Sequence, residues 1–188
     1  MQSIATLYIG EVENRYLTGE VRRRVLSGLY KLPQVVINNE KVLLRDGQVL
    51  EIDGIRVECL MVPGHTWGHM AYLVDDRYLF TGDAIWFGAD GGYSFISSLA
   101  EDNGLAVRSL AELEARLRAR DLEPLVLTGH TGWTDDLGFA FAHRDRLCSV
   151  WRRHVPDPSA PYDAYDESDD TEEAARTVRL RGVAGQEA

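Results

Sequence analysis

A run of short apolar segments separated by turn-forming residues occupies positions 41–82, and it limits the fold more than any other feature of the chain. Five segments have the length and the branched or aromatic content of β-strands: Lys41–Leu44, Val49–Ile52, Ile55–Val62, Ala71–Val74 and Tyr78–Thr81. The pairs Asp46-Gly47 and Asp53-Gly54 are typical of tight hairpin turns. The sequence therefore predicts a run of antiparallel strands in the middle of the chain.

Helical periodicity lies on either side of these strands. Glu11–Leu32 is helix-like, the leucines of Ala106–Arg120 fall on one helical face, and a last helix is expected at about Asp135–Trp151. Leu125–Leu127 has the pattern of one further buried strand. Because 188 residues suffice for one sizeable core, the pattern predicts a single α+β domain.

The segment after residue 154 differs from the rest in composition. Proline and acidic residues dominate it, with nine acids against three arginines between Asp157 and Glu187. Few apolar side chains are available there to offset the entropy lost on ordering. We expect residues 1–154 to form the domain and residues 155–188 to form a disordered acidic tail.

The charge and the cysteine content narrow the classes of protein. A formal net charge of −10 disfavours binding to nucleic acid. No apolar run reaches the roughly 20 residues of a membrane-spanning helix, and the first residues lack the pattern of a secretory signal. We expect a cytoplasmic protein that binds neither nucleic acid nor membranes. Because Cys59 and Cys148 are too few for a thiolate cluster, any metal would need imidazole and carboxylate ligands.

Three predicted strands end in side chains that can bind metals. His65 lies in the loop sequence Pro-Gly-His-Thr-Trp-Gly-His, Asp83 ends a Thr-Gly-Asp, and His130 ends a Thr-Gly-His. If the strands lie side by side, the three side chains converge at one rim of the sheet. Their nitrogen and oxygen donors suit zinc, iron or manganese.

Each of these motifs also has a structural interpretation. A single loop histidine is more often structural than a ligand, and an aspartate after a strand often caps a turn. A zinc-binding helix with histidines four residues apart is excluded for His65 and His69, because Thr66 stands where that motif needs glutamate and two glycines oppose a helix. The common placement of the three residues favours a metal site.

The three motifs, in this order, resemble those of the metallo-β-lactamase superfamily, and the loop is most similar to the hydroxyacylglutathione hydrolase branch. By this resemblance His65 would ligate the first of two zinc ions, Asp83 would bridge both ions, and His130 would ligate the second. Zinc-activated water would then hydrolyse an ester, thioester or related bond of a small-molecule substrate, with Asp83 as the catalytic carboxylate. His69 would form hydrogen bonds behind the ligands.

The resemblance also implies an αβ/βα sandwich that is truncated at its N-terminal side. The superfamily takes its other ligands from a His-x-His-x-Asp-His motif, and this chain has no His-x-His. Neither zinc ion would then keep three protein ligands, so we expect weak metal binding and impaired activity. A truncated sandwich would also expose an apolar sheet face, which predicts a homodimer or a complementing N-terminal chain.

Other notable side chains have weaker functional interpretations. Aromatic residues near the motifs could line a substrate pocket, although they more often fill a core: Trp67, Trp86, Phe87, Tyr93 and Trp133. His143 and His154 lie away from the strand ends and are expected to be surface or packing residues. Cys59 alternates with apolar residues along a strand, which predicts a small buried side chain.

Two further functions compete with that of a hydrolase remnant. The chain could be an interaction module that keeps relict ligands, or one half of a split enzyme. A di-iron redox site of the flavodiiron type is disfavoured, because no flavin-binding domain is present in this sequence.

Overall fold

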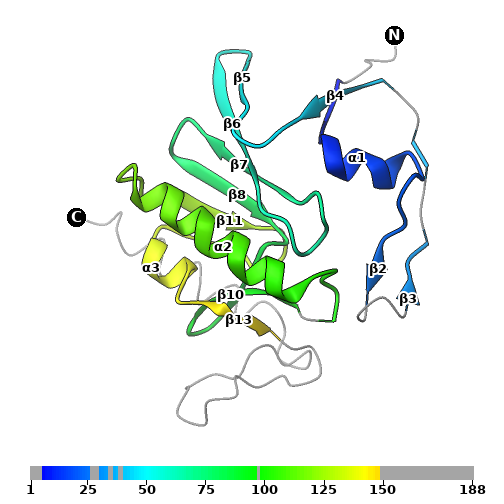
Figure 1. The fold of residues 1–188 in the computed structure, drawn as a ribbon. Helices are drawn as coiled ribbons and strands as arrows, with labels where there is room; N and C mark the ends of the chain where they lie inside the picture. Colours follow the sequence, from blue (N-terminus) through cyan, green and yellow to red (C-terminus); the bar gives the residue numbers. More distant parts are fainter. Residues whose placement is uncertain (1–5, 26–29, 34–35, 38–39, 97, 149–188) are drawn as a thin grey trace.

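The computed structural model describes residues 6–25, 30–33, 36–37, 40–96 and 98–148 (Figure 1). The predicted tail at 155–188 and His154 lie outside these residues. The elements are, in chain order, β1 (Leu7–Gly10), α1 (Glu11–Leu17), β2 (Arg24–Val25), β3 (Tyr30–Lys31), β4 (Lys41–Leu44), β5 (Val49–Ile52), β6 (Ile55–Met61), β7 (Met70–Val74), β8 (Tyr78–Gly82), β9 (Ile85–Gly88), β10 (Gly91–Ile96), α2 (Asn103–Arg118), β11 (Leu125–Thr128), β12 (Trp133–Thr134), α3 (Leu137–Ala140) and β13 (His143–Cys148).

The main sheet has six strands in the order β12-β11-β8-β7-β6-β5. The strands from β5 to β8 are antiparallel neighbours, as the turn residues predict, and β11 joins β8 in parallel. At the turn between β7 and β8, Asp75 and Asp76 have φ angles of 51° and 55°. Tight hairpin turns require such positive angles, and aspartate tolerates them better than most residues.

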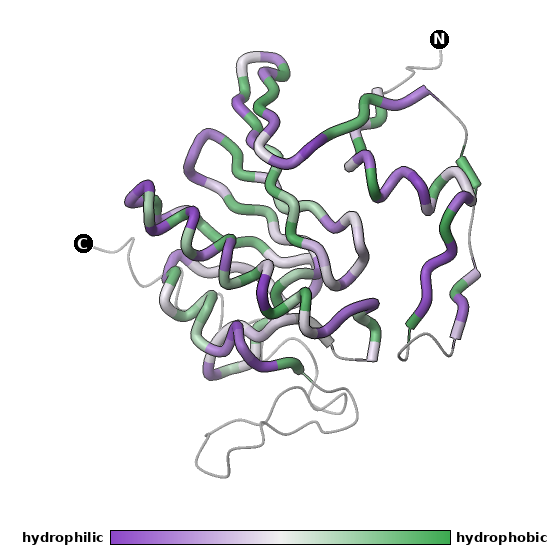
Figure 2. The backbone as a smooth tube through the Cα atoms, in the orientation of Figure 1, coloured by the Kyte–Doolittle hydropathy of each residue, from purple (hydrophilic) through white to green (hydrophobic). Residues whose placement is uncertain are grey.

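Helix α2 covers one face of this sheet (Figures 1 and 2). Leu110, Leu113 and Leu117 are buried on the side of α2 that packs against the strands. Their three- and four-residue spacing places them on one helical face, as predicted. Asp102 begins the helix, because its side chain accepts a hydrogen bond of 2.8 Å from the Leu105 N–H.

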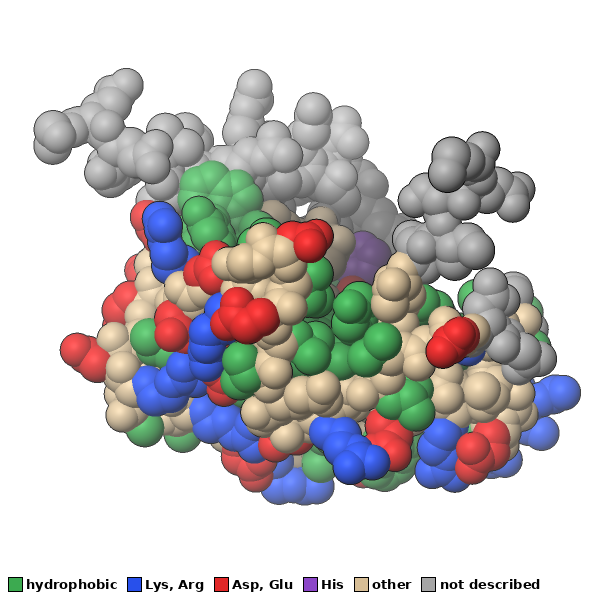
Figure 3. All heavy atoms as spheres, turned by 90° about the horizontal axis from the view of Figure 1, so that it is seen from above, with side chains coloured by type: hydrophobic (Ala, Val, Ile, Leu, Met, Phe, Trp, Pro, Cys, Tyr) green, Lys and Arg blue, Asp and Glu red, His purple; other side chains and the backbone are tan. Residues whose placement is uncertain are grey.

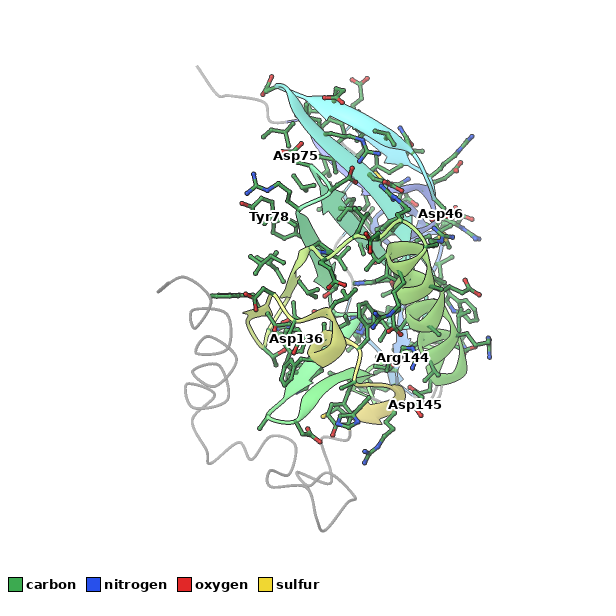
Figure 4. All side chains as sticks on the ribbon, turned by 90° about the vertical axis from the view of Figure 1, so that its left-hand side faces the viewer. Asp46, Asp75, Tyr78, Asp136, Arg144 and Asp145 are labelled. Atoms are coloured by element: carbon green, nitrogen blue, oxygen red, sulfur yellow. The ribbon has the colours of Figure 1, made fainter. Side chains whose placement is uncertain are left out.

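The opposite face of the sheet carries apolar side chains that are exposed. Phe80 is 43% exposed and Tyr78 is 38% exposed, and both come from β8. Phe80 is paired with Tyr72 on one side and with Leu127 on the other, and both neighbours are half-buried. Figure 4 shows Tyr78 on the side of the sheet away from α2. We call these four residues the uncovered sheet face.

A second sheet of three strands, β13-β10-β9, lies beside α2 and α3. β10 pairs antiparallel with β9 and parallel with β13.

The prediction of a helix at about Asp135–Trp151 is wrong beyond its first turn, because β13 occupies the second part of that range. α3 ends at Ala140, and from His143 the chain is a strand, where Ser94 donates a hydrogen bond of 2.6 Å to the Arg144 carbonyl.

Two predictions for the N-terminal part are also wrong. The helix expected at Glu11–Leu32 ends at Leu17, because Gly19 follows with a φ angle of +79° and the chain turns into β2. The Asp46-Gly47 pair does not close a hairpin, because β4 leaves the main sheet and pairs in parallel with β1. Long-range pairing of this kind cannot be read from a local turn signal.

Seen from above in Figure 3, acidic and basic side chains are interspersed around a central group of apolar side chains. No extended basic region lies on this face of the described molecule. None of the helices described is long and apolar enough to cross a membrane.

Candidate metal centre

Three strands of the main sheet run in the same direction and end at the same rim. β7 pairs antiparallel with both β6 and β8, and β11 is parallel to β8. The carboxyl ends of β6, β8 and β11 therefore lie together. The loops after these strands carry His65, Asp83 and His130, which were predicted as ligands.

The carboxylate of Asp83 lies between the two imidazoles. Its Oδ2 atom is 3.3 Å from His65 Nε2, and its Oδ1 atom is 3.2 Å from His130 Nε2. His65 is buried, whereas the side chain of His130 is 57% exposed. The structure thus brings the three side chains together, while their role as ligands stays a prediction.

The loop that carries His65 is held against α2 and α1 by two close glycine contacts. A Cβ atom on Gly64 would lie 2.3 Å from the Cα atom of Ala106, and Gly64 has a φ angle of +141°. A Cβ atom on Gly68 would lie 2.3 Å from the backbone nitrogen of Glu13. Only glycine allows the helices to approach this closely.

The position of Asp83 depends on two further glycines. Gly82 has a φ angle of +53°, which turns the chain at the end of β8. The Gly129 N–H donates a hydrogen bond of 2.8 Å to the Gly82 carbonyl, so the two ligand loops are joined directly. These contacts explain why a glycine precedes both Asp83 and His130.

The donors fit zinc in chemistry and in spacing, but they do not complete a site. In a tetrahedral zinc site with ligand distances of about 2.0–2.1 Å, two donors lie roughly 3.3 Å apart. The two imidazole–carboxylate distances, 3.3 Å and 3.2 Å, match this edge, so His65, Asp83 and His130 would supply one imidazole and one oxygen to each of two ions. Within the described part of the chain, no group of three or more His, Cys, Asp or Glu side chains could hold a metal ion.

His65 is in the protonation state that a metal ligand requires. Burial, followed by repulsion from Arg23, His69 and His130, lowers the pKa of His65 to about 2. The imidazole is therefore neutral at physiological pH, and its contact with Asp83 is not an ion pair. A neutral imidazole can offer its nitrogen lone pair to a cation.

His69 lies behind the predicted ligands. Its Nε2 atom is 2.9 Å from the Thr81 carbonyl oxygen, which can only accept, so the ring donates this hydrogen bond. Its ring meets the ring of His65 edge-on, with 5.6 Å between centroids. The hydrogen bond joins His69 to the end of the strand that leads to Asp83, and its supporting role behind metal ligands stays a prediction.

Arg23, which no sequence motif indicated, contacts His65 directly. The Arg23 Nη2 atom lies 2.6 Å from His65 Nε2 and donates a second hydrogen bond of 3.1 Å to the Leu99 carbonyl. No motif surrounds Arg23, because it precedes β2 in a segment that the sequence assigned to a helix. The structure therefore adds a cationic side chain to the site.

Glu101, which no sequence motif indicated either, joins three segments around the His65 loop. Its carboxylate accepts hydrogen bonds of 3.1 Å from the backbone N–H groups of Arg24 and Trp67, and a further bond from the Tyr16 hydroxyl. Desolvation and the Glu101 charge raise the pKa of Tyr16 above its usual range. The hydroxyl is therefore a stable donor to the carboxylate.

The aromatic residues near the motifs divide into two groups. Trp86 lies beside His130, with 5.7 Å between ring centroids, and Trp67 is exposed in the His65 loop. Phe87 and Tyr93 are buried in the interior, and Trp133 is half-buried opposite Leu127 on the sheet. Of the five, Trp86 is the one that the described structure places beside a predicted ligand.

His143 and Cys59 are not part of this site. His143 begins β13 and packs against Tyr93, and its Nε2 atom lies 2.9 Å from an oxygen of Asp90. Cys59 is fully buried in the apolar cluster with Leu44 and Met70, as predicted, and burial raises the pKa of its thiol.

Comparisons with curated proteins identify hydrolases as relatives. The chain is 39% identical over 115 residues to the hydroxyacylglutathione hydrolase of Serratia proteamaculans, which covers 60% of this chain and 42% of that protein. It is 31% identical over 78 residues to a protein of Bacillus subtilis named as a probable polyketide biosynthesis zinc-dependent hydrolase, covering 42% of this chain and 31% of that protein. The chain thus spans less than half the length of these relatives. No family profile matches the sequence.

A comparison with solved structures defines the fold. The structure is similar to an archaeal metallo-β-lactamase superfamily protein from Sulfolobus tokodaii, with a TM-score of 0.56 and 16% sequence identity over 97% of this chain and 71% of that one. This likeness identifies the metallo-β-lactamase fold. The hydrolase relatives and this fold agree with the resemblance of the three ordered motifs to the metallo-β-lactamase superfamily.

Proposed function

We propose that this chain contributes one half of a two-zinc site to a hydrolase that acts on an ester, a thioester or a related bond of a small molecule. The observation that carries the proposal is the placement of Asp83, whose two oxygens face two different imidazoles. A carboxylate with this geometry can bridge two metals, whereas a turn-capping aspartate would face backbone N–H groups. The names of the curated relatives support zinc and hydrolysis.

Each residue has a distinct role in this proposal. Zinc lowers the pKa of a bound water and polarises the bond under attack. Asp83 would hold the two metal positions at a fixed separation, with neutral His65 on one side and His130 on the other. His69 would keep Asp83 in place through its hydrogen bond to Thr81. Exposed His130 and neighbouring Trp86 would face the substrate.

We propose that the isolated chain binds zinc weakly and hydrolyses its substrate slowly, because the described residues would supply only two donors to each metal position. Zinc binding by the full chain tests the ligand set. Asp83→Asn should lower zinc affinity at least tenfold, measured by competition with a chromophoric chelator. Asp53→Asn, in the distant turn between β5 and β6, is the matched control and should have no effect.

Two results would contradict the proposal. Equal zinc affinity in all three proteins would remove Asp83 from the ligand set. Near-stoichiometric zinc after dialysis, measured by elemental analysis, would show that the chain holds a complete site. Hydrolysis of a glutathione thioester with added zinc should be slow in the unmodified chain and lost in Asp83→Asn.

A role as an interaction module is the second candidate, and the uncovered sheet face favours it. Exposed Phe80 and Tyr78 would be covered by a second copy of the chain or by a complementing N-terminal chain. Light scattering should detect association, which Phe80→Thr should weaken and the exposed edge substitution Val49→Thr should not. A monomer at all concentrations would contradict self-association. Association without zinc binding would favour the interaction module over the hydrolase.

A further inference from the structure

A small pocket lies between the first turn of α1, the turn after β4 and the strand ends that lead into and out of the His65 loop. It has a volume of about 90 Å³. Its lining consists of Glu11, Val12, Leu44, Arg45, Asp46, Met61, Gly68 and Met70. None of the three predicted metal ligands lines it, so it is a different site from the imidazole–carboxylate cluster.

The elements on both sides of the pocket are packed closely together. A Cβ atom on Gly68, in the His65 loop, would lie 2.3 Å from the backbone nitrogen of Glu13 in α1. A Cβ atom on Gly10, just before α1, would lie 2.9 Å from Met70 Cγ. The pocket is therefore a gap between elements that already touch at its sides.

The walls of the pocket are mainly apolar. Leu44 and Met70 are buried in one apolar cluster with Cys59, and Met61 packs against that cluster. Val12 adds a half-buried side chain from α1. Methionine side chains are flexible and polarisable, so they adapt to the shape of a bound apolar group. This interior favours an aliphatic ligand.

The charged side chains at the pocket are already compensated. Arg45 Nε donates a hydrogen bond of 2.8 Å to Glu11, and Arg116 from α2 donates bonds of 2.8 and 2.9 Å to the two oxygens of Asp46. These hydrogen bonds lower the pKa values of both carboxyls, which are therefore ionised at neutral pH. Each pair has no net charge, so the pocket favours neither a cation nor an anion.

The volume limits the ligand to a few carbon atoms. An apolar cavity of about 150 Å³ holds benzene, which has six carbons, so about 90 Å³ admits roughly three or four. We propose that the pocket binds the branched alkyl group of a small uncharged molecule, such as a short alcohol. Met61 ends β6, Met70 begins β7, and the two are paired in the sheet. A ligand in the pocket would thus contact both ends of the loop that carries His65.

Isobutanol is the probe for this site, and the methionine methyl groups report its binding to the full chain. The chain has three methionines, of which Met61 and Met70 line the pocket and Met1 does not. With ¹³C-labelled methionine methyls, the NMR signals of Met61 and Met70 should shift together and saturate with one Kd in the millimolar range, as expected for so small a ligand. The Met1 signal should not follow this curve.

Two substitutions of valine by phenylalanine locate the binding. Val12→Phe fills the pocket and should abolish the saturable shifts. Val42→Phe, at an exposed position of β4 outside the lining, should keep them. If Val12→Phe folds poorly by circular dichroism, Val12→Leu replaces it and should weaken binding at least threefold. Unchanged binding in the filled variant would overturn the proposal.

Charged relatives of the probe test the ligand class. Isobutyrate and isobutylammonium have the same alkyl group with opposite charges, and each should bind at least threefold more weakly than isobutanol. Tighter binding of either ion would overturn the uncharged class. Shifts that grow linearly at all three methionines would indicate a solvent effect and overturn the site. None of these measurements involves zinc, so the hydrolase proposal stands or falls separately.

Discussion

Gly129 lies directly against Asp83, since a Cβ atom at Gly129 would be 2.6 Å from Asp83 Oδ1. Gly129→Ala should therefore push the carboxylate out of its position between the imidazoles. Because the clashing atom is the end of a side chain, the free energy of unfolding should change by about 1 kcal/mol or less, as for other small repacking effects. Zinc affinity should fall at least tenfold in the chelator competition.

Gly104→Ala is the control for this substitution. Gly104 lies in the first turn of α2, where alanine is a better helix former by about 1 kcal/mol. Zinc affinity should be unchanged in that variant. Unchanged zinc affinity in Gly129→Ala would show that the position of Asp83 does not determine metal binding.

Gly64 should be far less tolerant of substitution, because its neighbour is backbone. A Cβ atom there would lie 2.3 Å from Ala106 Cα, at a φ angle of +141° that side chains rarely adopt. Gly64→Ala should lower the free energy of unfolding by about 3 kcal/mol, from overpacking and backbone strain together. Urea denaturation measures this loss.

Gly47→Ala separates the two causes. Gly47 also has a positive φ angle, +72°, but its Cβ atom would meet nothing within 4 Å. This variant should lose only about 1–2 kcal/mol, the cost of the backbone conformation. Equal losses at Gly47 and Gly64 would mean that the α2 contact contributes nothing.

The convergence of His65, Asp83 and His130 could be predicted from sequence because each residue follows its own strand and glycine. Each signal is local, and only the parallel direction of β6, β8 and β11 was needed to bring His65, Asp83 and His130 together. The turn at Asp75 was predictable for the same reason, because its signal lies in the neighbouring residues Asp75 and Asp76.

Arg23 and β13 could not be predicted because pairing between distant segments determines them. His143–Cys148 lies in a stretch with helical periodicity, and its pairing with β10 overrides that preference. Arg23 contacts His65 in a region where Glu101 joins the start of β2 to the His65 loop and the Leu99 carbonyl accepts a hydrogen bond from Arg23. Neither relationship has a signal in the residues around it.

The burial of His65 predicts a pH dependence of stability in the metal-free chain. Its pKa is lowered to about 2 in the folded state, below the ordinary value of about 6.5 that we assign to the unfolded state. Below about pH 6.5 the unfolded chain therefore binds a proton that the folded chain does not. The contribution of His65 to the free energy of unfolding is therefore fully present above about pH 6.5. It is lost as the pH falls below that value, by up to about 1.4 kcal/mol per pH unit.

Urea denaturation between about pH 7 and about pH 5, in the presence of a chelator, measures the slope. His65→Gln should flatten it, because the buried titrating group is gone. Val49→Thr, an exposed substitution that involves no titrating group, should leave the slope unchanged. An equal slope in His65→Gln and the unmodified chain would exclude His65 as its source.

Glu101→Gln should loosen both the His65 loop and the segment that carries Arg23. One amide oxygen can still accept, but the NH₂ group would face an N–H of Trp67 or Arg24, leaving a partly buried donor unsatisfied. The expected loss of unfolding free energy is about 1–3 kcal/mol.

Tyr16→Phe should lower the free energy of unfolding by less than Glu101→Gln does, since the carboxylate keeps its two backbone donors. In a double-mutant cycle measured by urea denaturation, the losses should be non-additive by at least 0.5 kcal/mol, roughly the lower limit for residues in contact. Additive losses would mean that Tyr16 and Glu101 act separately.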